Sequence, residues 1–170
     1  MRSVIVVNER GDPLGSTDLL SAHTGEGTLH KAFSVYVFRN QGREILIQRR
    51  SAEKMLWPLI WANTCCSHPF PEETSKEAGE RRLREEMGFS CPLREESTFV
   101  YRAEDPGRGV EHEHVTLLTA NVDAVKPVPN PAEVAEWKWI DVKALQKNMQ
   151  AQPESYAPWF HLGLQKIFAP

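Results

Sequence analysis

Residues 61–69, WANTCCSHP, place two thiols and one imidazole beside a proline. Side chains of these types can ligate a metal ion, attack as a nucleophile, or move protons as an acid and base. A free cysteine is more often a small buried apolar side chain. The nine residues alone leave all of these roles open.

Two further histidines, His23 and His30, stand in the stretch AHTGEGTLH. Gly25 and Gly27 predict a loop here, so the seven-residue spacing of the histidines carries no meaning as a helical face. Taken singly, each is more often a surface residue than a ligand. A role at a metal therefore depends on partners from elsewhere in the chain.

The stretch VEHEH supplies such partners in two ways. On a strand, Glu111 and Glu113 point to one face and can reach one ion, whereas His112 and His114 point to the opposite face. A histidine pair at this spacing is as good a zinc ligand pair as the glutamate pair. The alternation alone leaves open which face holds a metal.

The clearest helix signal is TSKEAGERRLREEMG. Thr74 followed by Glu77 predicts a capping box at its start, and Gly88 is placed to end the helix. Arg82 and Glu86 lie four residues apart at the border of the predicted buried face. They are either an exposed, weak ion pair or part of a site.

From Glu73, the pattern E-x7-R-x-L-x-E-E-x-G resembles the Nudix box, whose carboxylates hold a divalent cation against a diphosphate. Two positions depart from the box, because Ser67 stands where it opens with glycine and Arg82 where it carries glutamate. A guanidinium in place of a carboxylate removes a metal ligand and adds a phosphate-binding fork. Arg82 therefore predicts that the diphosphate is held and not cleaved.

The surrounding pattern predicts an α+β fold with a mixed sheet, in one domain over residues 1–170. Asn40-Gln41-Gly42 predicts a hairpin turn. Val-, Ile- and aromatic-rich or alternating runs predict the strands, and two short helices are expected near the C-terminus. The predicted strands are 3–7, 32–38, 44–48, 98–103, 113–120 and 134–140, and the helices 142–149 and 159–168.

Composition limits the function classes. The chain has 170 residues, 41% of them apolar, and a net charge of −3, with no run of five basic residues that predicts a nucleic-acid or membrane partner. Its three cysteines do not suggest a disulfide framework. The N-terminal apolar run is too short for a signal peptide and no segment approaches a membrane span. We expect a cytoplasmic protein.

With CCSHP before the altered box, the chain resembles the type I isopentenyl-diphosphate isomerase family, whose Nudix-like mixed β-sheet is sandwiched by helices. The resemblance covers most of the chain. Its landmarks occur in the family's order, in SAHTGEGTLHKAFSVYVF, QRRSAEKMLWP, WANTCCSHP, RRLREEMG, VYRAEDPGRGVEHEH and APWF. It implies an enzyme of isoprenoid biosynthesis that interconverts isopentenyl and dimethylallyl diphosphate through a carbocation.

The resemblance also implies two divalent ions and no flavin or other redox cofactor. It favours Glu111 and Glu113, and not His112 and His114, as metal ligands. It leaves the identity of the tightly bound metal open among Zn²⁺, Mn²⁺ and Mg²⁺. Glu86 matches a carboxylate associated with a Mg²⁺ ion that bridges to the substrate diphosphate. The implied ligands of the tightly bound metal are His23, His30, His68, Glu111 and Glu113.

The implied substrate site has charged and apolar parts. Arg50, Lys54 and Arg82 match the residues that bind the diphosphate, and Trp159 matches an indole that stabilises the carbocation. Trp159 could instead be a core residue that packs a C-terminal helix, and this core interpretation is preferred for the other four tryptophans, Trp57, Trp61, Trp137 and Trp139.

The resemblance implies that Cys66 moves protons on one side of the alkene, and that Glu113 with Tyr101 does so on the other. We expect Glu113 with Tyr101 to protonate the methylene and Cys66 to take the allylic proton, with the roles reversed in the back reaction. Cys65 and Cys91 are expected to be small buried side chains.

Two rival functions are weighed against this one. A Nudix hydrolase keeps the fold, but Arg82 and Cys66 argue against it. A structural zinc module for RNA or protein lacks paired C-x2-C knuckles and a basic aromatic stripe. The expected partner is therefore a small isoprenoid diphosphate, with no nucleic acid or membrane, bound to a monomer or weak dimer.

Overall fold

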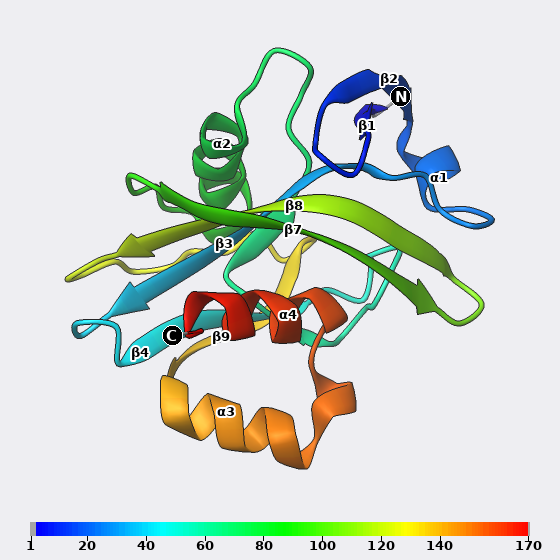
Figure 1. The fold of residues 1–170 in the computed structure, drawn as a ribbon. Helices are drawn as coiled ribbons and strands as arrows, with labels where there is room; N and C mark the ends of the chain where they lie inside the picture. Colours follow the sequence, from blue (N-terminus) through cyan, green and yellow to red (C-terminus); the bar gives the residue numbers. More distant parts are fainter. Residues whose placement is uncertain (1–2, 170) are drawn as a thin grey trace.

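The computed structural model describes residues 3–169, so residues 1, 2 and 170 of the predicted domain lie outside the described part. A curled sheet forms the centre of the molecule (Figure 1). Its strands are β1 (Ser3–Val7), β2 (Pro13–Asp18), β3 (His30–Arg39), β4 (Glu44–Arg50), β5 (Trp61–Ala62), β6 (Cys65–Ser67), β7 (Arg94–Asp105), β8 (Gly109–Asn121) and β9 (Val134–Asp141). The helices are α1 (Leu19–Ala22), α2 (Ser75–Met87), α3 (Val142–Ala151), the 3₁₀ helix Pro153–Ser155 and α4 (Pro158–Ile167).

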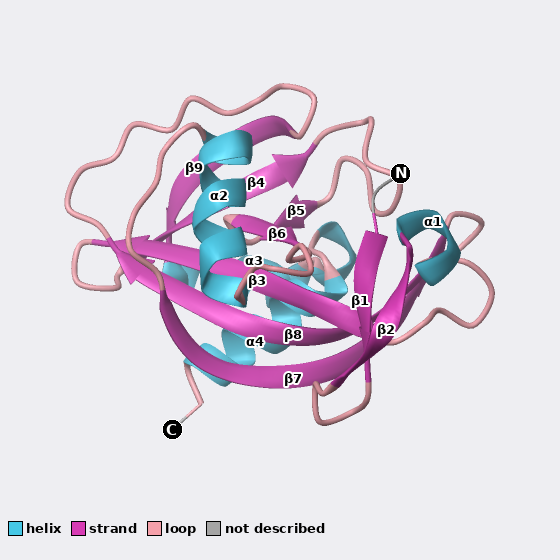
Figure 2. Cartoon of the chain, turned by 90° about the horizontal axis from the view of Figure 1, so that it is seen from above, coloured by secondary structure: helices cyan, strands magenta, loops and turns pink. Residues whose placement is uncertain are grey.

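The sheet is mixed, as predicted. Strand β3 runs parallel to β8, with His30 beside Glu113, whereas the other pairs of named strands within residues 3–169 are antiparallel. Helix α2 covers one face, and α3 and α4 cover the other (Figures 1 and 2). The predicted sandwich of a sheet between helices is therefore confirmed.

Strand β3 is buried on both faces, which explains its nearly continuous apolar run. Phe33, Val35 and Val37 pack in the core cluster that includes Leu83 of α2. The alternate positions, such as Tyr36, pack in the second cluster with α3 and α4. The central strand thus contributes side chains to the core clusters on both faces of the sheet.

The predicted limits of the central helix are confirmed. Thr74 and Glu77 form the capping box, and Gly88 ends α2 with φ 73°. A Cβ at Gly88 would lie 2.3 Å from the carbonyl oxygen of Val128, so this close approach requires glycine. The helix therefore ends directly against the loop that precedes β9.

Several short elements were not predicted, because two- to six-residue segments carry too few side chains to show a period. They are β2, α1, β5, β6 and the 3₁₀ helix, and β6 places Cys65 and Cys66 on a strand paired with β3. The core interpretation of Trp137 is wrong, since 37% of its surface is exposed. No helix among residues 3–169 is long and apolar enough to cross a membrane.

Candidate active site

A pocket of about 380 Å³ opens where α1, β4, β6, α2 and β8 meet. It gathers most of the predicted site residues, and His30 and Tyr101 lie directly behind its wall, in contact with His68 and Glu113. The predicted residues that line it are His23, Arg50, Lys54, Cys66, His68, Arg82, Glu86, Glu111, Glu113 and Trp159.

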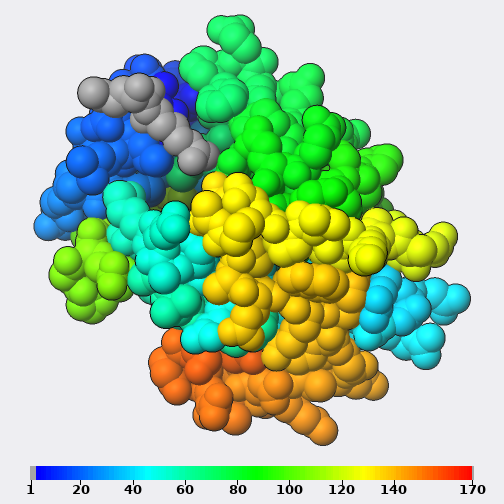
Figure 3. All heavy atoms as spheres, turned by 180° about the vertical axis from the view of Figure 1, so that it is seen from behind, coloured from blue at the N-terminus to red at the C-terminus, as the bar shows by residue number. Residues whose placement is uncertain are grey.

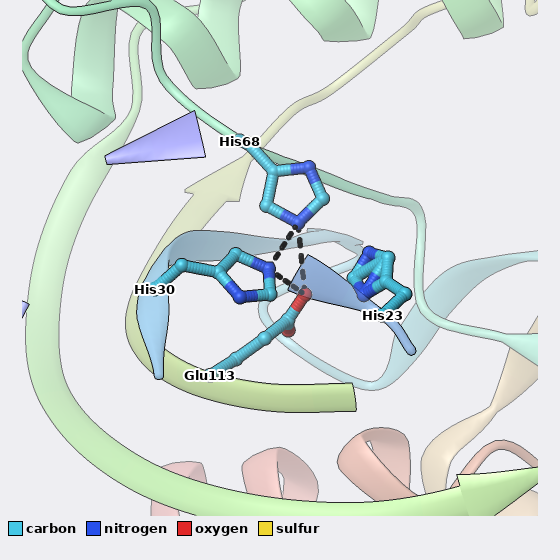
Figure 4. Close-up of side chains that lie close together, drawn as sticks. All are labelled: His23, His30, His68 and Glu113. Carbon is cyan, nitrogen blue, oxygen red and sulfur yellow. Dashed lines mark hydrogen bonds and ion pairs between the residues drawn. The ribbon is translucent and has the colours of Figure 1, made fainter. Parts of the chain in front are cut away.

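Four of the predicted metal ligands form a cluster at one end of the pocket (Figure 4). One ligand atom each from His23, His30, His68 and Glu113 lies within 4.8 Å of the others. The Nε2 atoms of His30 and His68 are 3.1 Å apart, and Glu113 Oε1 lies 2.9 Å from His68 Nε2. Four potential ligand atoms therefore face one point.

The sheet positions three of these four residues. His30 opens β3 beside Glu113 on β8, and His68 directly follows β6, which pairs with β3. His23 comes from outside the sheet, as the residue that ends α1. Its carbonyl accepts from the Val110 amide at 2.9 Å, so the start of β8 fixes this residue too.

Gly109, with φ 151°, makes that contact possible. A Cβ at this position would lie 2.6 Å from the carbonyl oxygen of His23, closer than a side chain tolerates. The glycine at the start of β8 therefore lets this strand approach His23.

The hydrogen bonds of the cluster suit a divalent cation. His30 Nδ1 lies 2.7 Å from the Thr28 carbonyl, which only accepts, so this nitrogen carries the proton and Nε2 faces the cluster with its lone pair. His23 Nδ1 is buried and has no hydrogen-bond partner within residues 3–169. Nitrogen and oxygen donors of this kind fit Zn²⁺, Mn²⁺ or a similar ion.

The charges of the cluster agree with that reading. Burial, with the nearby His30 and His68, lowers the pKa of His23 to about 4, so its imidazole is neutral at pH 7. Burial alone would raise the pKa of Glu113, but the neighbouring imidazoles of His30 and His68 hold this pKa well below its usual range. The cluster thus combines the neutral imidazole of His23 with an ionised carboxylate.

Glu111 lies beside this cluster but outside the four-residue group. The Tyr101 hydroxyl donates to Glu111 and lies 3.0 Å from Glu113 Oε2, so it links the two carboxylates. Burial and the charge of Glu113 raise the pKa of Glu111. Unlike Glu113, Glu111 therefore readily holds a proton.

The predicted alternation along β8 is confirmed. Glu111 and Glu113 share the face that lines the pocket. The neighbouring imidazoles turn away: His112 Nδ1 faces the Gly27 carbonyl at 3.4 Å, and the His114 ring packs against Gly11. The carboxylate pair, and not the histidine pair, therefore faces the imidazole cluster.

The adjacent thiols have separate environments. Cys65 is fully buried in the core cluster under α2, as expected, whereas Cys66 lines the pocket 3.9 Å from Arg50 Nη1. Cys91 is partly buried against the same core. Burial raises the pKa of the Cys66 thiol to about 12, although Arg50 opposes the shift. Cys66 is therefore the thiol available for chemistry.

Trp159 forms an aromatic wall of the pocket. Only 2% of its surface is exposed, and its indole nitrogen donates to Asn63 Oδ1 at 3.0 Å. Arg50 lies over the ring at 5.2 Å. The indole is thus fixed from two sides, and its orientation is set before any ligand binds.

The cationic residues occupy two different situations. Arg50 donates to the carbonyls of Leu56 and Trp57, so much of its hydrogen-bonding capacity holds the loop between β4 and β5. Lys54 and Arg82 instead face carboxylates at the other end of the pocket, Glu86 and Glu133. Arg82 and Glu86 are both more than 90% buried, which excludes the exposed-pair interpretation.

Three residues of the site were not predicted. Glu133 pairs with both Lys54 and Arg82, Gln48 donates to Glu86 at 3.2 Å, and Asn63 orients Trp159. Glu133 follows a proline-rich loop with no motif around it, and Gln48 was assigned to a strand without a role. Only the tertiary fold brings these residues to the pocket.

Comparisons with known proteins agree with this arrangement. The model of the NUDIX domain family matches residues 28–160. An isopentenyl-diphosphate Delta-isomerase of Halorhodospira halophila is 40% identical over 167 residues, covering 98% of this chain and 95% of that protein. Its counterpart in Nocardia farcinica is 43% identical over 157 residues, covering 92% and 89%.

Solved structures share the fold at lower sequence identity. A Deinococcus radiodurans protein has a TM-score of 0.70 and 22% identity, covering 88% of this chain and 90% of its own. The MutT protein from Methanosarcina mazei has a TM-score of 0.62 and 17% identity, covering 81% and 91%. These two structures establish the arrangement of strands and helices alone.

Proposed function

We propose a mechanism for this pocket from the premise that the chain belongs to the isopentenyl-diphosphate Delta-isomerase family of NUDIX-domain proteins. The protein is an isomerase that interconverts isopentenyl and dimethylallyl diphosphate in isoprenoid biosynthesis. The reaction moves one double bond. It therefore needs a proton added at one carbon and another removed from an allylic carbon.

The proposed metal centre comprises His23, His30, His68, Glu111 and Glu113. The proximity of four of their ligand atoms and the unpartnered His23 Nδ1 support it. When bound, a divalent ion supplies positive charge that favours the ionised forms of nearby acids. The choice among Zn²⁺, Mn²⁺ and Mg²⁺ belongs to this proposal and is tested by metal analysis of the purified protein.

We place the substrate diphosphate at the opposite end of the pocket. Lys54 and Arg82 neutralise its charge and Arg50 contributes from the side, whereas Glu86 would hold a Mg²⁺ ion, which would supply further positive charge to the diphosphate. A pocket of about 380 Å³ fits a five-carbon ligand and its diphosphate. The hydrocarbon then extends toward Cys66 and Trp159.

Two proton-transfer groups flank that hydrocarbon. Glu113 with Tyr101 gives a proton to the methylene of isopentenyl diphosphate, the indole of Trp159 stabilises the tertiary cation, and Cys66 takes the allylic proton. The forward step thus begins with one proton held by the hydrogen-bonded group of Glu111, Tyr101 and Glu113 and with a Cys66 thiolate. It ends with that group one proton poorer and with a Cys66 thiol. The back reaction begins from this second state, so the two protonation states serve the two directions.

The positive charges of Arg50 and Lys54 lower the pKa of Cys66 against the effect of burial. They therefore support the thiolate that the forward step requires. Glu111, which shares the Tyr101 hydroxyl with Glu113, lies where it can relay a proton through that hydroxyl.

One observation carries this assignment: Cys66 on β6 and the Tyr101–Glu113 pair from β7 and β8 meet at one pocket beside the imidazole cluster. We test it by incubating the protein with isopentenyl diphosphate and Mg²⁺ and quantifying dimethylallyl diphosphate. Glu113→Gln should abolish product, and His114→Gln, on the other face of β8, should not. Equal activity in the two variants would contradict the assignment.

Location and assembly remain part of the proposal. The three cysteines are free thiols, which supports a reducing compartment such as the cytoplasm. We expect a monomer or weak dimer that needs no nucleic acid or membrane. Light scattering of the purified protein tests the assembly state.

A further inference from the structure

Glu133 closes a ring of four charged side chains at the diphosphate end of the pocket. Its carboxylate lies 2.9 Å from Arg82 Nη2 and contacts Lys54 Nζ. Glu86 lies 2.5 Å from the same Arg82 nitrogen and 3.8 Å from Lys54 Nζ. Each cation is therefore held between the same two carboxylates.

The backbone around Glu133 is fastened on both sides. The Asn130 amide donates to the Glu86 carbonyl at 2.8 Å, which holds the loop to the end of α2. The Ser51 amide donates to the Glu133 carbonyl at 3.0 Å, just after β4. Seen from behind, residues around 125–135 lie between the green α2 region and the cyan residues around 55 (Figure 3). Glu133 is thus built into the pocket wall.

The four charges of the ring sum to zero, and its side chains are largely shielded from solvent. Side-chain exposure is 17% for Lys54, 10% for Arg82, 2% for Glu86 and 23% for Glu133. The half-exposed Glu85 also binds Arg82 but is shared with Arg81 at the rim. Charges this shielded from water interact more strongly than surface pairs.

This balance bears on the form in which a diphosphate can enter. A metal-free diphosphate gains Lys54 and Arg82 as partners, but it also faces two carboxylates at close range. A diphosphate that carries a divalent cation presents that cation to the same carboxylates. The carboxylates therefore penalise the first form and favour the second.

We propose that Glu133 is a specificity-determining residue that makes the pocket accept diphosphate as its Mg²⁺ complex, while it positions Lys54 and Arg82. The inference rests on the proposed diphosphate site. It differs from a purely structural ion pair, because a structural role predicts no change in how strongly Mg²⁺ promotes diphosphate binding.

Glu133→Gln separates the two roles, since the amide keeps the size and can still accept from Arg82. Calorimetry measures binding of inorganic diphosphate to the purified protein, first in Mg²⁺-free buffer and then with MgCl₂. We expect the variant to bind metal-free diphosphate about tenfold more tightly than the wild type. The gain from Mg²⁺, that is, the factor by which Mg²⁺ raises the affinity for diphosphate, should fall by a similar amount. Glu133→Asp keeps the charge and should keep the wild-type gain.

The matched control is Glu136→Gln, an exposed carboxylate on β9 that pairs with Arg49 away from the pocket. It should behave as the wild type. Thermal unfolding checks the fold of each variant, and Glu133→Ala, with the same expected direction, replaces the glutamine variant if that variant does not fold.

An unchanged gain from Mg²⁺ in Glu133→Gln, or loss of diphosphate binding in both buffers with the fold intact, overturns the inference while leaving the proposed function standing. A wild type that binds no diphosphate in either buffer overturns the proposed site as well.

Discussion

The two ends of the pocket differ in how their charges are balanced. At one end, three imidazoles and a carboxylate face one another, and within the described residues His23 Nδ1 has no hydrogen-bond partner. At the other, Lys54 and Arg82 are matched by Glu86 and Glu133. A bound cation therefore stabilises the first end most. The positive and negative charges of the second end already balance, so this end favours a ligand whose own charges are balanced too.

The two ends also differ in their construction. The imidazole end depends on strand register, with His30 beside Glu113 across β3 and β8. The ion-paired end depends on one face of α2 and on a loop fastened to the C-terminus of that helix. Substitutions at the first end should therefore change metal content, and those at the second should change diphosphate binding.

The largest effect is expected between the two ends, at Cys66. Cys66→Ala should lower turnover by about 10³-fold or more, because a proton-transfer group is lost, while the fold and metal content stay near wild type. Cys65→Ala should retain most of its activity, since this thiol only packs in the core. Steady-state assays and metal analysis check both. Loss of the tightly bound metal in Cys66→Ala, or an inactive Cys65→Ala, would reverse the roles of the two thiols.

At the imidazole end, His23→Ala, His68→Ala and Glu111→Gln should each lower metal occupancy and turnover together, by about 100-fold in metal affinity. His112→Ala is the control on the opposite face of β8 and should change neither. Metal analysis after dialysis measures occupancy. Loss of metal in His112→Ala, with full occupancy in Glu111→Gln, would show that the wrong face was assigned.

At the ion-paired end, Arg82→Glu should weaken diphosphate binding about 30-fold, as a cation is replaced by a repelling carboxylate. It restores the usual residue of the Nudix box, yet no hydrolase activity should appear, because one added carboxylate does not arrange the metals and water for hydrolysis. Calorimetry and a phosphate-release assay measure the two effects. Phosphate release faster than in the wild type would contradict this account of Arg82.

The smallest effect concerns stability in acid. Although burial opposes the shift, Lys54 and Arg82 lower the pKa of Glu133 to about 2, below its ordinary value of 4.5. A lowered pKa in the folded state stabilises the protein above pH 4.5, and this contribution is lost as the pH falls toward 2. Glu133→Gln should therefore lose less stability over this range, by about 1–2 kcal/mol after solvent screening. Denaturant unfolding at several pH values measures it, and parallel curves for both proteins would contradict it.

The sequence predicted the imidazole end better than the ion-paired end, for a physical reason. Glu111 and Glu113 share a face because strand geometry alternates side chains, and α2 carries its own start and end signals. Glu133 is 47 residues from Glu86 in the numbering and meets it only because the loop before β9 binds the end of α2. The short strand β6 likewise depends on pairing with β3 and not on its own three residues.

The central claim is that the pocket exchanges protons with carbon while the diphosphate stays intact. Turnover in D₂O, followed by mass spectrometry and a phosphate assay, tests it most directly. The account predicts deuterium on carbon in both isopentenyl and dimethylallyl diphosphate, with no phosphate released. Phosphate release as fast as isomerisation, or no carbon-bound deuterium in either diphosphate after prolonged incubation, would contradict it.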